Sequence, residues 1–170
     1  MVELSVIRDL VAILGVIGGF TYYVITVQSQ RKNQKLNALH NVMEKHQDRN
    51  FAWLWEDVMN WEWEDYEDFR EKYLNNHEMS SKYMIVFNFY EGIGYLWKTG
   101  VFDLDAVGAR WFGPWCVITY WKFKPIIDEF RERYYSDWMK SWEELTDELE
   151  AMVSDRMNPQ WVETIKPSSS

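Results

Sequence analysis

The strongest pattern along the chain is an uncharged apolar run over residues 10–30, LVAILGVIGGFTYYVITVQSQ. In a helix that rises about 1.5 Å per residue, a run of this length covers about 31 Å, which is close to the hydrocarbon thickness of a bilayer. The pattern therefore predicts a transmembrane helix over residues 10–30.

Two other interpretations of this run stay open. A cleaved signal peptide needs a basic start and a small-residue cleavage site, whereas acidic and basic residues mix before position 10 and bulky aromatic residues follow Gly18 and Gly19. A buried core helix would also accommodate the polar residues in the last turns of the run. A signal peptide would be cleaved from the protein, and a core helix would be covered by the rest of the chain instead of by lipid.

Positively charged residues cluster directly after the run, at Arg31, Lys32 and Lys35. Lysine and arginine resist translocation, so the flank that carries them is expected in the cytoplasm. This predicts a single-pass protein of the inner or plasma membrane, with a short external N-terminus over residues 1–9 and a basic membrane collar and stalk helix over residues 31–48. The first 35 residues carry a net charge of +2 (four basic, two acidic) and the rest carries −11 (14 basic, 25 acidic), so anionic headgroups would attract the collar and repel the remainder.

Gly15 and Gly19 form a GxxxG spacing within the predicted span. Such a pair lets two membrane helices approach closely, which makes transmembrane helix packing one interpretation. The other interpretation is that the spacing arises from composition alone, since many membrane spans contain such a glycine pair.

Beyond residue 48 the apolar positions follow helical spacing, and no strand alternation is evident. Residues 51–73 carry an apolar stripe that predicts one long helix or two, with a break near Glu62 and Trp63. Residues 83–97 are apolar nearly all round, which predicts a helix in the middle of a bundle. Further helices are predicted over residues 104–112, 115–135 and 138–152.

Turn-forming residues separate these segments. Gly100 predicts a left-handed helix stop, Asp103 a cap for the short helix that follows, and Pro125 a kink or restart. The expected fold class is all-α, with one N-terminal transmembrane helix continuing into a cytoplasmic bundle of about five helices. This helical cytoplasmic domain is expected over residues 49–158, followed by a flexible tail over residues 159–170.

Composition narrows the function classes. A hydrophobic content of 47% is far above that of a disordered chain, and a net charge of −9 argues against nucleic acid as a partner. Cys116 is the single cysteine, so neither an intramolecular disulfide nor a paired-cysteine zinc site is expected. The chain has no phosphate loop, dinucleotide fingerprint or nucleophile elbow, so we expect no cofactor, no metal and no catalytic residues.

Four tryptophans stand close together, more than one buried stripe needs: Trp53, Trp55, Trp61 and Trp63. Exposed tryptophan is typical of interface anchors, which makes this group a possible interface with a partner or with the membrane surface. Core filling is the other interpretation of the same residues.

Glu91 is the one charged residue between positions 83 and 97. A buried carboxylate needs a partner because desolvation penalises its charged form. We expect a structural ion pair with Arg131 or Arg110 from a neighbouring helix. The alternative, a catalytic acid, would require a second acid, base or metal ligand, and none is identifiable in the sequence.

One longer stretch carries a family resemblance: FNFYEGIGYLWKTGVFDLDAVGARWFG from Phe87 to Gly113. It is followed by W-K-x-K-P at Trp121 to Pro125 and by Arg131, with the block EDYEDFREKY ahead of it. This arrangement resembles an uncharacterised prokaryotic domain-of-unknown-function family, numbered 4760. The resemblance implies a single-pass membrane protein with a helical cytoplasmic domain, and it implies no activity.

These features together predict a membrane-tethered helical interaction protein, a scaffold or accessory subunit of a larger membrane complex without catalytic activity of its own. Its expected partners are the lipid bilayer and other membrane protein subunits or further copies of itself. The alternative is a self-associating membrane effector or sensor, for example in phage defence. A third interpretation is an enzyme centred on Glu91.

Overall fold

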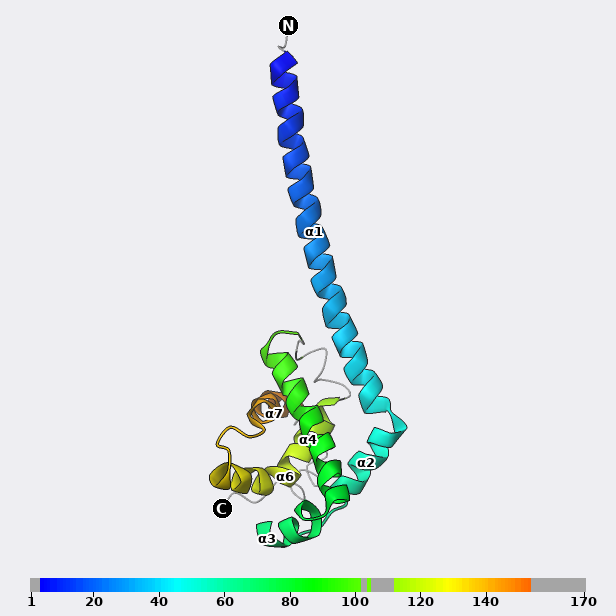
Figure 1. Ribbon diagram of the computed structural model, residues 1–170, viewed down its shortest axis with the longest axis vertical. Helices are drawn as coiled ribbons and strands as arrows, with labels where there is room; N and C mark the ends of the chain where they lie inside the picture. Colours follow the sequence, from blue (N-terminus) through cyan, green and yellow to red (C-terminus); the bar gives the residue numbers. More distant parts are fainter. Residues whose placement is uncertain (1–3, 102–103, 105–111, 154–170) are drawn as a thin grey trace. The chain divides into compact units, whose positions relative to one another are not determined.

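The computed structural model describes residues 4–101, 104 and 112–153. The chain divides into two compact units, residues 1–40 and residues 41–170. All regular secondary structure within the described ranges is helical, as Figure 1 shows. The all-α fold class is confirmed, and the expected tail over residues 159–170 lies outside the described residues.

The first unit consists of the greater part of α1 (Leu4–Gln47), a single helix that contains the whole apolar run. It continues without a break through the basic collar to Gln47, one residue before the expected end of the stalk at residue 48. The large apolar side chains of the run are exposed, among them Leu10, Val11, Ile13, Leu14, Val16, Ile17 and Phe20. α1 is long and apolar enough to cross a membrane, and it lies near the N-terminus.

Two helices, not one, follow over the stripe of residues 51–73. α2 (Arg49–Met59) begins at Asp48, whose carboxylate accepts hydrogen bonds from the backbone N–H groups of Asn50 and Phe51. The break comes directly after α2, close to the expected position. α3 (Tyr66–Phe69) then begins at Asp65 and runs on as the π-helical turn η1 (Arg70–Leu74).

α4 (His77–Lys98) contains the apolar segment of residues 83–97 and ends before Gly100, which has a φ of 72° as its left-handed stop requires. The expectation of a helix in the middle of the bundle is only partly right. One side of α4 is buried, whereas Ile85 and Tyr95 on it are exposed.

Two further helices complete the described part of the second unit. α6 (Gly113–Arg133) runs continuously through Pro125, so the helix does not restart there. α7 (Lys140–Val153) begins slightly later than expected, after Met139, which has a positive φ of 55°. The helix expected over residues 104–112, with its cap Asp103, falls almost entirely outside the described residues.

The core of the second unit lies where α7 packs against α4 and α6. Trp142 of α7 is completely buried and stacks on Tyr90 of α4, with ring centroids 5.0 Å apart. Leu145 and Leu149 repeat on the same side of α7 at helical spacing and are also fully buried. The remaining fully buried large side chains include Phe69, Val86, Phe87, Ile93, Phe123, Ile126 and Ile127.

Candidate functional site

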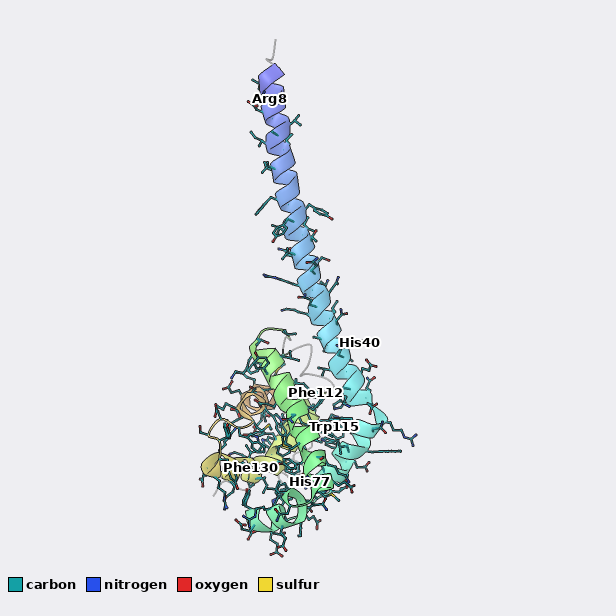
Figure 2. The ribbon with its side chains drawn as sticks, viewed as in Figure 1. Arg8, His40, His77, Phe112, Trp115 and Phe130 are labelled. Carbon is teal, nitrogen blue, oxygen red and sulfur yellow. The ribbon has the colours of Figure 1, made fainter. Side chains whose placement is uncertain are left out.

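An open groove of about 920 Å³ lies between α2, the loop after it and α6. We call it the tryptophan groove and define it by the residues that carry its walls: Trp55, Met59, Trp61, Trp63, Trp115, Ile118 and Lys122. Trp115, labelled in Figure 2, belongs to α6 and meets α2 through Trp55. The groove therefore depends on two helices that are far apart in sequence.

Trp55 and Trp115 form a right-angled corner of the groove. Their ring centroids are 4.7 Å apart and their planes are inclined by 89°. The indole N–H of Trp55 donates to the Thr119 hydroxyl at 2.9 Å, and this hydroxyl donates to the Trp115 carbonyl at 2.6 Å. The Trp55 indole is half-buried and its hydrogen bond to Thr119 restricts its rotation, whereas the Trp115 indole is exposed and contacts Trp55 edge to face.

Trp61 forms part of the wall but belongs mainly to the core. It is only 6% exposed and stacks parallel on Tyr73, with ring centroids 4.0 Å apart. The Tyr73 hydroxyl donates to the carbonyl of Glu62 at 3.1 Å and accepts from its N–H at 3.2 Å, which ties the loop to η1. For Trp61 the core-filling interpretation is the better one.

Trp63 and Lys122 form the opposite side of the groove. Trp63 is half-buried and stacks on Phe123, with ring centroids 5.1 Å apart. The Lys122 ammonium lies 5.0 Å from the Trp63 ring centroid and donates to the Trp61 carbonyl at 2.8 Å. Burial lowers the pKa of Lys122. Sequence reasoning did not single out Lys122, although it lies within the W-K-x-K-P motif.

Carboxylates surround the groove. Glu56, Glu62 and Glu64 are exposed, and no basic side chain of the described residues comes within salt-bridge distance of them. Lys72 also borders the groove, but its ammonium is bound to Asp68 at 2.7 Å. The rim of the groove is therefore predominantly negative.

Trp53 lies outside the groove and is the most exposed of the four tryptophans singled out in the sequence, with 56% of its surface accessible. The Arg49 guanidinium lies over its ring at 4.1 Å from the centroid. The four tryptophans thus have three different settings: Trp61 in the core, Trp55 and Trp63 on the walls of the groove, and Trp53 on the surface.

The predicted ion pair of Glu91 with Arg131 is wrong. The Glu91 carboxylate accepts hydrogen bonds from the backbone N–H groups of Ser141 at 3.2 Å and Trp142 at 2.8 Å. These groups belong to the first turn of α7, where helical N–H groups have no partner within their own helix. A carboxylate also interacts favourably with the positive end of the helix dipole. Arg110, the other predicted partner, lies outside the described residues.

Arg131 instead binds the segment that precedes α7 and the first turn of α7. Its guanidinium donates to the backbone carbonyls of Trp138 and Met139 and forms a salt bridge with Glu143 at 3.0 Å. Glu143 also accepts from the Tyr120 hydroxyl at 3.0 Å and binds the Lys140 ammonium at 2.6 Å. Burial alone would raise the pKa of Glu143, but the hydrogen bonds from Lys140, Arg131 and Tyr120 hold it at about 2.

This cluster predicts an acid-sensitive contribution to stability. Because the folded-state pKa of Glu143 is depressed, its contribution is complete above the ordinary value of 4.5 and is lost as the pH falls toward about 2. With 18% of the side chain exposed, we expect about 1–2 kcal/mol from this source after solvent screening. Urea unfolding of the full chain in detergent at several pH values would measure it. The stability gap between wild type and Glu143→Gln should shrink below pH 4.5, and a gap that stays constant would contradict the assignment.

Comparison with known proteins places the whole described site within one family match. A family model described as a domain of unknown function (DUF4760) matches residues 8–153. No curated protein and no solved structure matches the chain. The matched range includes the apolar run, the tryptophan groove and the contact between Glu91 and α7.

Proposed function

Because the chain belongs to the DUF4760 family, whose description states no activity, we propose a function from the chain's own architecture. The protein is a single-pass membrane protein that holds a helical interaction domain at the cytoplasmic face of the inner or plasma membrane. There it acts as a scaffold or accessory subunit of a larger membrane assembly. Its mechanism is tethering, because confinement to the membrane raises the effective concentration of the domain for other membrane-bound proteins.

The observation that carries this proposal is the exposed apolar surface of α1. The most apolar window of the helix has a mean hydropathy of 2.1, and none of it is buried. A core helix would be buried by the rest of the chain, whereas a bilayer covers such a surface from outside. The Thr21 and Thr26 hydroxyls donate to the carbonyls of Ile17 and Tyr22, each at 2.8 Å, so these polar groups are compatible with lipid.

The orientation follows from the collar. Arg31, Lys32 and Lys35 are exposed on α1 directly after the apolar run. Their positive charge favours the cytoplasmic side, where anionic headgroups would bind them. The helical domain is then also cytoplasmic, because it follows the collar in the chain.

A second candidate function is self-association of a membrane effector or sensor through α1. An added Cβ at Gly15 or Gly19 would meet nothing within 4 Å in the described chain, so this face of the helix is open to close approach by another helix. The GxxxG pair would then determine the oligomeric state. Gly15→Leu with Gly19→Leu should abolish self-association in this case and leave a scaffold's binding to other subunits intact.

Cysteine accessibility in whole cells tests the proposed topology. Cys116 is completely buried, and burial raises the pKa of its thiol to about 12, so it should not react in the folded protein. We expect Glu148→Cys, an exposed position on α7, to be labelled by a membrane-permeant maleimide but by an impermeant one only after the cells are opened. Ser5→Cys serves as the matched control and should react with the impermeant reagent in intact cells. Labelling of Glu148→Cys from outside, or extraction of the chain by alkaline carbonate, would overturn the proposal.

A further inference from the structure

We propose that the tryptophan groove binds arginine side chains in a basic segment of a partner protein. This inference rests on the proposed interaction function and assigns it a surface and a partner chemistry. Three properties of the groove support it: walls that are held in place before a ligand arrives, aromatic faces that attract cations, and a negatively charged rim.

The walls are preorganised by contacts within the chain. Trp55 is held by its hydrogen bond to Thr119, Trp61 by its stacking on Tyr73, and Trp63 by its stacking on Phe123. A ligand therefore does not have to immobilise these side chains on binding, which lowers the entropic cost.

The faces of indole rings attract cations through their negative quadrupole, and the described residues show this contact twice. Within the groove, the Lys122 ammonium lies over Trp63, and elsewhere on α2 the Arg49 guanidinium lies over Trp53. The corner formed by Trp55 and Trp115 has no cation of this kind among the described residues. Its two perpendicular rings line the groove and are the position that we assign to an arginine of the partner.

The charge around the groove favours the same class of ligand. Two basic side chains border it and both have partners: Lys72 forms a salt bridge with Asp68, and Lys122 donates a hydrogen bond to the Trp61 carbonyl. The carboxylates of Glu56 and Glu64 have no salt bridge within the described part of the chain. Arginine suits this position better than lysine, because its flat guanidinium stacks on indole and can bind a carboxylate with two N–H groups at once.

The extent of the groove favours a peptide segment over a single small molecule. A second hollow of about 420 Å³ adjoins it and shares Trp55, Glu56 and Trp115 with it. The two hollows form one continuous surface, with His46 and Phe51 lining the second one. Such a surface can accept several consecutive residues of an extended segment.

The test uses the full chain, labelled with 5-fluorotryptophan and reconstituted into nanodiscs of zwitterionic lipid. The probe is an acetylated, amidated hexapeptide of alternating glycine and arginine, and its control is the same peptide with citrulline, which keeps the shape and removes the charge. We expect the arginine peptide to shift the ¹⁹F resonances of Trp55 and Trp115, assigned through Trp→Phe variants. The resonance of Trp142, which is completely buried, should stay unchanged. Citrulline should bind about tenfold more weakly or not at all.

Matched charge variants separate the groove from general electrostatic attraction. The double variant E56Q/E64Q should weaken binding of the arginine peptide about fivefold or more, while E132Q/E148Q, which removes the same charge at exposed positions away from the groove, should change it less than twofold. Equal weakening by both variants, equal binding of the citrulline peptide, or shifts confined to other tryptophans would overturn the inference. The proposed membrane topology is measured independently by cysteine labelling, so failure of one leaves the other standing.

Discussion

A Gly94→Ala substitution is expected to lower the free energy of unfolding of the helical domain by about 3 kcal/mol or more, because it inserts a methyl group where two helices are in backbone contact. An added Cβ on Gly94 of α4 would collide with the carbonyl group of Ser141 at the start of α7 and would lie 2.9 Å from the Trp142 amide nitrogen. These neighbours are backbone atoms, so no side-chain rotation can relieve the overlap. The helices would have to move apart.

Moving α7 away from α4 would also disturb the interactions that surround this contact. Glu91, one turn before Gly94, accepts hydrogen bonds from the N–H groups of Ser141 and Trp142. Trp142 stacks on Tyr90 and is fully buried, so a shift would leave poorly packed space beside a large aromatic side chain. The effect should therefore exceed that of an ordinary extra methyl group in a core.

Gly92 provides a matched control on the same helix. It is exposed, and an added Cβ there would meet nothing within 4 Å. Gly92→Ala should leave stability unchanged or raise it by up to about 1 kcal/mol, since alanine is the better helix former. Urea unfolding of both full-length variants in detergent, followed by tryptophan fluorescence, measures the difference. Equal stability of the two variants would contradict the close approach of α4 and α7.

The two glycines also show where sequence reasoning reaches its limit. The segment EGIGYLW predicts a helix from its apolar spacing, and α4 confirms that prediction. Nothing local distinguishes Gly92 from Gly94, because only the arrival of α7 makes one position tight and leaves the other open. Element type follows from periodicity along the chain, whereas close approaches depend on tertiary packing.

The pairing of Glu91 with Arg131 could not be judged from the sequence for a related reason. A carboxylate in an apolar helix needs a partner, and the residue types in the sequence point only to cationic side chains. Within the described residues, Glu91 instead accepts from backbone N–H groups at the start of α7, which no residue type in the sequence reveals. Arg131 instead forms a salt bridge with Glu143 and donates hydrogen bonds to carbonyls of the segment before α7.

The tryptophan groove was predictable only in parts. The cluster over residues 53–63 was identified as unusual, and two of its members line the groove from half-buried positions. The contribution of α6 could not be foreseen, because Trp55 and Thr119 are 64 residues apart in sequence and meet only after folding. The position of Lys122 in the groove could not be predicted, because a single lysine between aromatic residues is equally typical of the exposed face of a helix.

The second large effect is expected for the double variant Ile13→Asp/Ile17→Asp, which should abolish integration of the chain into the membrane. Both side chains are exposed and lie one helical turn apart in the apolar run of α1. A carboxylate near the middle of a membrane helix costs about 2.5–3.5 kcal/mol on insertion, so two of them should cost about 5–7 kcal/mol. The protein should leave the carbonate-resistant membrane fraction, which cell fractionation and immunoblotting would measure.

The matched control is Gln34→Asp/Leu36→Asp, which introduces the same two charges on the same helix beyond the apolar run. These positions are exposed, and acidic residues have little influence on the orientation of a membrane helix, so the control should remain integrated. If both variants stay in the membrane fraction, the apolar run does not contact lipid and another protein must cover it. If both variants leave the membrane fraction, the added negative charge itself prevents integration, whatever its depth in the bilayer. Only loss confined to the Ile13 and Ile17 variant supports the interpretation that the bilayer covers the exposed surface of α1.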